Sequence, residues 1–145
     1  MKPQTAGLLV GGMIPALGYS LFAVGTKLAA QSNLGAGPLL VLVGAACIAV
    51  GAVFWKLLPS GLDPVGAGWG LLAGLAWAAG TGFVSLVLTR WGVPISKLNP
   101  IYNTNTLLTV AIGLVAFGEW KQVHPVQLII GAGLILAGSL LVSGA

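Results

Sequence analysis

The strongest candidates for chemistry are polar residues in the fourth long apolar stretch of the chain. They are Asn99, Tyr102, Asn103 and Thr106. Their spacing of three, four and seven residues from the first predicts that they share one face of a helix. Amides and hydroxyls donate and accept hydrogen bonds without a fixed charge, which suits a polar metabolite or a drug-like amphiphile. The alternative is structural, with Asn99 as a helix cap before a first-turn proline and the other polar groups bonding a neighbouring helix.

Three other side chains are candidates for the same binding site, and each has a structural alternative. Trp77 lies in the middle of an uncharged run, where it forms a wall of a path or is a buried indole with a partner for its N–H group. Tyr19 is open to the same two interpretations. Lys27 ends the first apolar run, so it extends to the lipid headgroups or attracts an anionic substrate group.

Enzymatic motifs are missing from the sequence, which has no glycine-rich phosphate loop, no paired carboxylates and a single His. We therefore expect no catalytic residue, no metal site and no cofactor. Glu119 and His124 flank the last connector, where a structural role is favoured over coupling. Because no carboxylate lies within an apolar run, proton coupling is disfavoured. Two modes of transport stay open. One is facilitated movement, and the other is coupling to a cation through carbonyl and hydroxyl oxygens at broken helices.

Composition indicates that lipid covers most of the molecule. Hydrophobic residues make up 57% of the chain and charged residues only 6%, far below what the surface of a soluble domain of this size requires. The mean hydropathy is +1.03. The few basic residues are scattered and form no patch, so a nucleic-acid partner is excluded.

Apolar runs of the length needed to cross a bilayer follow one another with short connectors. They predict an all-α membrane protein, a single transmembrane domain over residues 1–145 with a bundle of five helices. The expected spans are approximately 5–28, 36–57, 65–90, 99–118 and 125–144. The first run is too long for a secretory signal, so we expect a retained helix and a multi-pass protein of the cell (inner) membrane.

Basic residues are divided evenly between the two sides that five spans define. Lys2, Lys56 and Lys121 share one side, and Lys27, Arg90 and Lys97 share the other. Positive charge on short loops normally fixes the orientation of a protein in the membrane, and here the equal numbers indicate no preferred orientation. Either a weak bias escapes this simple count, for example because Lys27 should be discounted, or the protein inserts in both orientations.

Small residues predict where helices meet, because glycine lets neighbouring backbones approach closely in a membrane. Gly66, Gly70 and Gly74 repeat every fourth residue and form a smooth stripe along the third run. Pro15 removes one backbone hydrogen bond from the first run and predicts a kink there. Cys47 is expected to serve in packing.

The order of motifs from the fourth run onward resembles that of a known family. The motifs are Asn99–Tyr102, Phe117–Glu119, Gln127 and Ile130–Gly138. This order is similar to the glycine–glutamate turn and terminal glycine-rich helix of the drug/metabolite transporter superfamily, in its EamA-type five-helix unit. The first helix matches more loosely, with Gly18–Tyr19 where a tryptophan–glycine pair is usual and Lys27 where a lysine often closes the helix.

The resemblance implies half of a transporter, since familiar members join two such units in opposite orientations around a central path. A single unit can match that architecture by pairing with an inverted copy of itself. We therefore expect a small-molecule transporter that works by alternating access as an antiparallel homodimer, with spans one, three and four lining the path. Two alternatives stay open: a lipid or lipid-linked sugar translocase subunit, and a non-transporting membrane protein that assembles with a larger partner.

Overall fold

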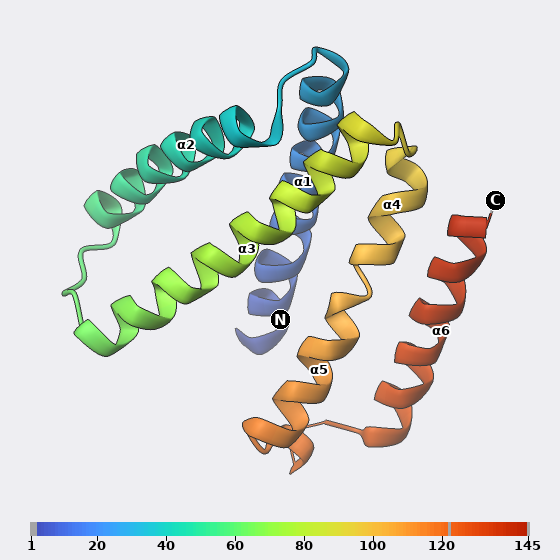
Figure 1. The fold of residues 1–145 in the computed structure, drawn as a ribbon. Helices are drawn as coiled ribbons and strands as arrows, with labels where there is room; N and C mark the ends of the chain where they lie inside the picture. The colour runs from blue at the N-terminus through green and yellow to red at the C-terminus, as the bar shows by residue number, and fades with distance from the viewer. Residues whose placement is uncertain (1–2, 122, 145) are drawn as a thin grey trace. The chain divides into compact units, whose positions relative to one another are not determined.

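The computed structural model describes residues 3–121 and 123–144, and this part of the chain is helical without any strand (Figure 1). The helices group into two compact units, Met1–Gly92 and Val93–Ala145. The first unit holds α1 (Pro3–Gln31), α2 (Ala36–Leu57) and α3 (Pro64–Arg90). The second holds α4 (Ile95–Tyr102), α5 (Asn105–Ala116), the short 3₁₀ helix η1 (Glu119–Lys121) and α6 (Pro125–Gly144).

Local turn chemistry fixes the helix ends in the first unit. Asn33 adopts a left-handed conformation with φ of 60° just after α1. The N–H of Leu34 donates to the carbonyl of Ala29 at 3.0 Å and the N–H of Asn33 to that of Ala30 at 3.1 Å, the paired bonds of a Schellman motif. At the start of α3, the Asp63 carboxylate accepts a 2.7 Å hydrogen bond from the N–H of Gly66.

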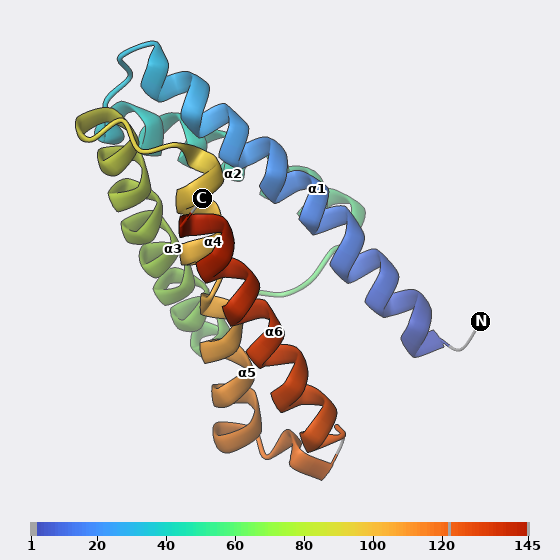
Figure 2. The same ribbon diagram turned by 90° about the vertical axis from the view of Figure 1, so that its right-hand side faces the viewer.

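The helices of the first unit pack chiefly through α3, which contacts both α1 and α2. The buried residues concentrate in the C-terminal parts of α1 and α3: Ala23, Thr26, Thr81, Ser85 and Leu88. At the α2 contact, a Cβ on Gly82 would lie 3.4 Å from Cδ1 of Leu40, so glycine permits the close approach. α1 is one helix through Pro15, and its N-terminal half extends away from the other two helices (Figure 2).

In the second unit, α4 and α6 lie side by side, and α5 follows α4 in the chain (Figure 1). The Ser143 hydroxyl near the end of α6 lies 3.2 Å from the carbonyl oxygen of Lys97 in α4 and 2.7 Å from that of Ser139 in its own helix. The chain leaves α5 through Gly118, whose φ of 66° is one that glycine adopts without strain.

Within residues 3–121 and 123–144, four helices are long and apolar enough to cross a membrane, in agreement with four of the predicted spans. They are α1 from Leu9 to Gln31, α2, α3 and α6. At most 17% of the most apolar window of any of them is buried. Such exposed apolar surface indicates a membrane protein, since water tolerates only small apolar patches.

The fourth predicted span, residues 99–118, is not one helix in the structure. The helical segment begins earlier, at Ile95, and is divided between α4 and α5 at Asn103–Thr104. The expected bundle of five spanning helices in a single domain therefore remains a prediction.

Candidate functional site

The break between α4 and α5 is a tightened turn in a helical path. Asn103 has φ and ψ of −68° and −9°. Thr104 is similar, at −63° and −11°. At the break, the N–H groups of Thr104, Thr106 and Leu107 donate to carbonyls three residues earlier, at 2.9–3.2 Å. This is the 3₁₀ pattern, which marks hinges and strained positions within helices.

Proline and threonine side chains lie next to this break. Pro100 lies inside α4 and has no N–H for the carbonyl of Ser96 four residues earlier. The Thr104 hydroxyl donates to the Ile101 carbonyl at 2.6 Å, and the Thr106 hydroxyl donates to the Asn103 carbonyl at 2.9 Å. Hydroxyl bonds of this kind compete with the backbone ladder, but Ser20 and Thr26 make them within continuous α1, so at Asn103–Thr104 they accompany the break and do not by themselves explain it.

The structure gathers the predicted polar stripe at this break. Asn99 and Tyr102 are half-buried in α4, whereas Asn103 and Thr106 are exposed. The N–H of Asn103 donates to the Asn99 carbonyl at 3.1 Å, and its own carbonyl accepts from the backbone and the hydroxyl of Thr106. The capping alternative for Asn99 was wrong, because α4 already begins at Ile95 and Asn99 lies within it. The side-chain amide of Asn99 therefore does not cap the start of a helix.

A groove of about 230 Å³ lies between α5 and α6, next to the break. Thr106, Leu107 and Val110 line it from α5, and Gln127, Leu128, Gly131, Ala132 and Ile135 line it from α6. The wall is almost entirely apolar and carries no charged side chain. Thr106 belongs both to the break and to the groove, so a polar site and an apolar site are continuous.

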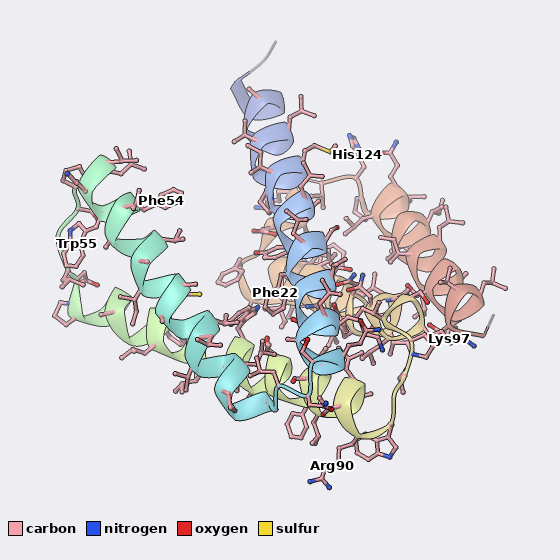
Figure 3. All side chains as sticks on the ribbon, turned by 90° about the horizontal axis from the view of Figure 1, so that it is seen from above. Phe22, Phe54, Trp55, Arg90, Lys97 and His124 are labelled. Carbon is pink, nitrogen blue, oxygen red and sulfur yellow. The ribbon has the colours of Figure 1, made fainter. Side chains whose placement is uncertain are left out.

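The other predicted site residues, Tyr19, Lys27 and Trp77, lie in the first unit. Tyr19 is 69% exposed on α1, and Lys27 is half-buried one turn before α1 ends. The ring of Trp77 lies 5.3 Å from that of Phe22, tilted by 44°, and this contact joins α3 to α1 (Figure 3 labels Phe22). Trp77 is 42% exposed in this single subunit, so the choice between a wall of a path and a buried indole stays open. Its contact gives it a packing role and leaves part of the ring accessible.

Buried hydroxyls at the contact regions of α1 and α3 are polar features that sequence reasoning missed. Thr26, Thr81 and Ser85 are each at most 6% exposed. The Thr26 hydroxyl donates to the Phe22 carbonyl at 2.9 Å. The Ser85 hydroxyl has no hydrogen-bond partner within residues 3–121 and 123–144. The four-residue spacing of Thr81 and Ser85 was a signal that one face of this run is shared.

The Glu119 carboxylate folds back against α5. A Cβ on Gly113 would lie only 2.6 Å from Glu119 Oε2, so the absence of a side chain at Gly113 makes room for this carboxylate. The carbonyl of His124 accepts the N–H of Leu128 at 3.1 Å, at the start of α6. His124 and Arg90 point outward at the ends of their segments (Figure 3).

The remaining candidates give no further site in the described part of the chain. Residues 3–121 and 123–144 contain no cluster of three His, Cys, Asp or Glu side chains that could hold a metal ion. Cys47 is exposed on α2, so its expected packing role has no support within this unit. The amide and hydroxyl groups at the break can bind by hydrogen bonds.

No protein-family model matches this sequence, and no significant match was found among curated proteins or solved structures. The resemblance to the EamA-type unit therefore stays a prediction, and function must be argued from the site itself.

Proposed function

We propose that this protein moves an uncharged polar or amphiphilic small molecule across a membrane, and that the break between α4 and α5 recognises it. The observation that carries this proposal is the position of the break. α4 and α5 together run from Ile95 to Ala116. At 1.5 Å per residue this path is about 33 Å long, enough to cross a bilayer. Asn103–Thr104 lies near the middle of this path, so a path that crosses the bilayer would hold the break at mid-depth.

An interrupted helix at mid-depth is a binding feature in membrane proteins. The backbone at this break is satisfied by 3₁₀ and threonine hydrogen bonds, but the polar side chains beside it are costly in lipid and favour a position that faces protein or a cavity. Discontinuous helices form the substrate sites of several transporter architectures for this reason. The polar side chains of Asn99, Asn103 and Thr106 supply recognition at the same place.

The chemistry of the break favours an uncharged ligand. Amide and hydroxyl groups bind hydroxyl, carbonyl or amine groups, and no charged side chain lines the adjoining groove. A charged ligand without a counter-ion would be costly at this depth. Both carboxylates of the chain lie outside the four apolar helices, at Asp63 and Glu119, so the described residues give proton coupling no support.

An antiparallel homodimer is our proposal for the working assembly. The even charge count supports it, and so does the uncovered part of the glycine stripe on α3. Gly70 and Gly74, in the stripe predicted to contact other helices, have no neighbouring atom within 4 Å of a built Cβ. The large exposed residues Trp69 and Leu72 lie on the same half of α3. A partner subunit that covers this region would give the glycine stripe the contact it lacks.

The proposal is tested by transport into liposomes that contain the purified chain. We expect a panel of labelled uncharged amphiphiles and polar metabolites to show uptake above protein-free liposomes for at least one compound. Asn103→Ala should reduce that uptake about tenfold, the effect of one or two lost hydrogen bonds. Assembly, measured by size-exclusion chromatography with light scattering, should not change.

Asn105→Ala is the matched control, because Asn105 is also exposed beside the break but lies off the face shared by Asn99, Asn103 and Thr106. Its uptake should stay within about twofold of the unmodified protein. Equal loss in both variants, or normal uptake in Asn103→Ala, overturns the assignment of the site. A chain that moves nothing favours the assembly-partner alternative, and movement of labelled phospholipid alone favours the translocase.

A further inference from the structure

The groove between α5 and α6 bears on the substrate class of the proposed transporter. We infer that the groove holds the apolar part of an uncharged amphiphile whose hydrogen-bonding part lies at the break. This inference rests on the proposed function, because it names the substrate class of the same site. Its occupant is the aromatic or short alkyl end of the substrate.

The size of the groove limits what it can hold. A cavity of about 150 Å³ holds a single benzene ring. The groove, at about 230 Å³, therefore suits one substituted ring or a short alkyl chain. A whole helix is about 10 Å across and does not fit. The groove is thus matched to part of a small molecule, and its apolar wall favours a ring over a sugar.

Two polar residues line the groove, Thr106 from α5 beside the break and Gln127 from the start of α6. Thr106 is the one that joins the groove to the break. Its hydroxyl donates to the Asn103 carbonyl at 2.9 Å, so its oxygen lone pairs remain able to accept from a ligand. Leu107 and Val110 continue the wall from this residue along α5. A ligand whose ring lies against these side chains would therefore place a hydroxyl at Thr106. An uncharged head fits because no ion pair is offered by the lining residues.

Gly131 and Ala132 are the small residues among those that line the groove from α6. Gly131 lines the groove, and a Cβ built there meets no atom within 4 Å. Gly133 is equally unobstructed on the same helix but does not line the groove. The same substitution at these two positions therefore separates filling of the groove from a general effect on α6.

The test uses binding of labelled phenyl glucoside and methyl glucoside to the purified full chain in detergent, by scintillation proximity. The two probes share the uncharged polar end, and only one has a ring. The unmodified protein and Gly133→Leu should prefer phenyl glucoside by about tenfold or more, the least expected from burial of a ring. Gly131→Leu should abolish this preference. Thr106→Val should weaken both probes by about fivefold, as expected from one lost hydrogen bond.

Three results would overturn the inference: no preference in the unmodified protein, an unchanged preference in Gly131→Leu, or equal loss in Gly131→Leu and Gly133→Leu. Loss of co-purified phospholipid from Gly131→Leu with an unchanged ring preference would assign the groove to a lipid chain instead. Binding in detergent does not require transport. A ring preference that depends on the groove, in a chain that moves no solute, would preserve this inference and refute the proposed function.

Discussion

Asn103 is the residue at which the structural and functional interpretations meet. Its backbone closes the tightened turn through Asn99 and Thr106, while its exposed carboxamide is available to a ligand. The sequence predicted the shared face of these residues from their spacing alone. It did not predict the break, because the same spacing is compatible with one continuous helix. The break shows in the 3₁₀ hydrogen bonds of the backbone, which the spacing of side chains does not report.

Ser85 gives a prediction about stability at the residue scale. Its hydroxyl is buried without a hydrogen-bond partner in the described residues, so the folded unit carries an uncompensated desolvation cost. Ser85→Ala should therefore stabilise the protein by about 1 kcal/mol, seen as a higher apparent melting temperature in detergent.

Thr26→Val is the control for Ser85→Ala, because the Thr26 hydroxyl is equally buried but donates to the Phe22 carbonyl. This variant should not raise the melting temperature. A lower melting temperature for Ser85→Ala would show that the assembled protein gives this hydroxyl a partner, and would contradict the prediction.

At the scale of helices, the apolar runs and the charged residues, prolines and glycines that bound them predicted most helix ends. The expected span 36–57 matches α2, and 65–90 matches α3 within one residue, because charged residues, prolines and glycines bound these runs. α1 is longer than the expected 5–28, because Ala29, Ala30 and Gln31 are good helix formers and the helix ends only at the Schellman motif around Asn33. Whether a second helix covers a given apolar face depends on tertiary contacts. For that reason the sequence predicted the glycine stripe on α3 but not that part of it lies uncovered.

The turn between α1 and α2 supplies a prediction at this scale. Asn33 has a φ of 60°, which glycine adopts freely and alanine does not. Asn33→Gly should leave the melting temperature nearly unchanged. Asn33→Ala should destabilise the turn by about 1 kcal/mol, because Cβ then opposes the left-handed conformation. Equal melting temperatures for the two variants would show that the Schellman motif is not formed in the membrane-embedded protein.

At the scale of the molecule, the sequence established the class of protein better than its architecture. Low charge and long apolar runs leave few alternatives to membrane helices, and four such helices are present. The arrangement of two or more subunits leaves almost no signature in one sequence, since a chain that packs against a copy of itself exposes the same apolar residues as one that faces lipid. The even division of basic residues is the exception, because it is the pattern that the proposed inverted pair requires.

Topology in the cell tests the antiparallel transporter most directly. Ser32 and Ser60 are exposed at opposite ends of α2, so cysteines placed there report opposite sides of the membrane once Cys47 is replaced by serine. An impermeant thiol reagent is added to intact cells that carry either variant, and labelling is compared with that of permeabilised cells. The account predicts partial labelling of about one half at both positions. Full labelling at one position and none at the other would establish a single orientation and contradict the inverted pair.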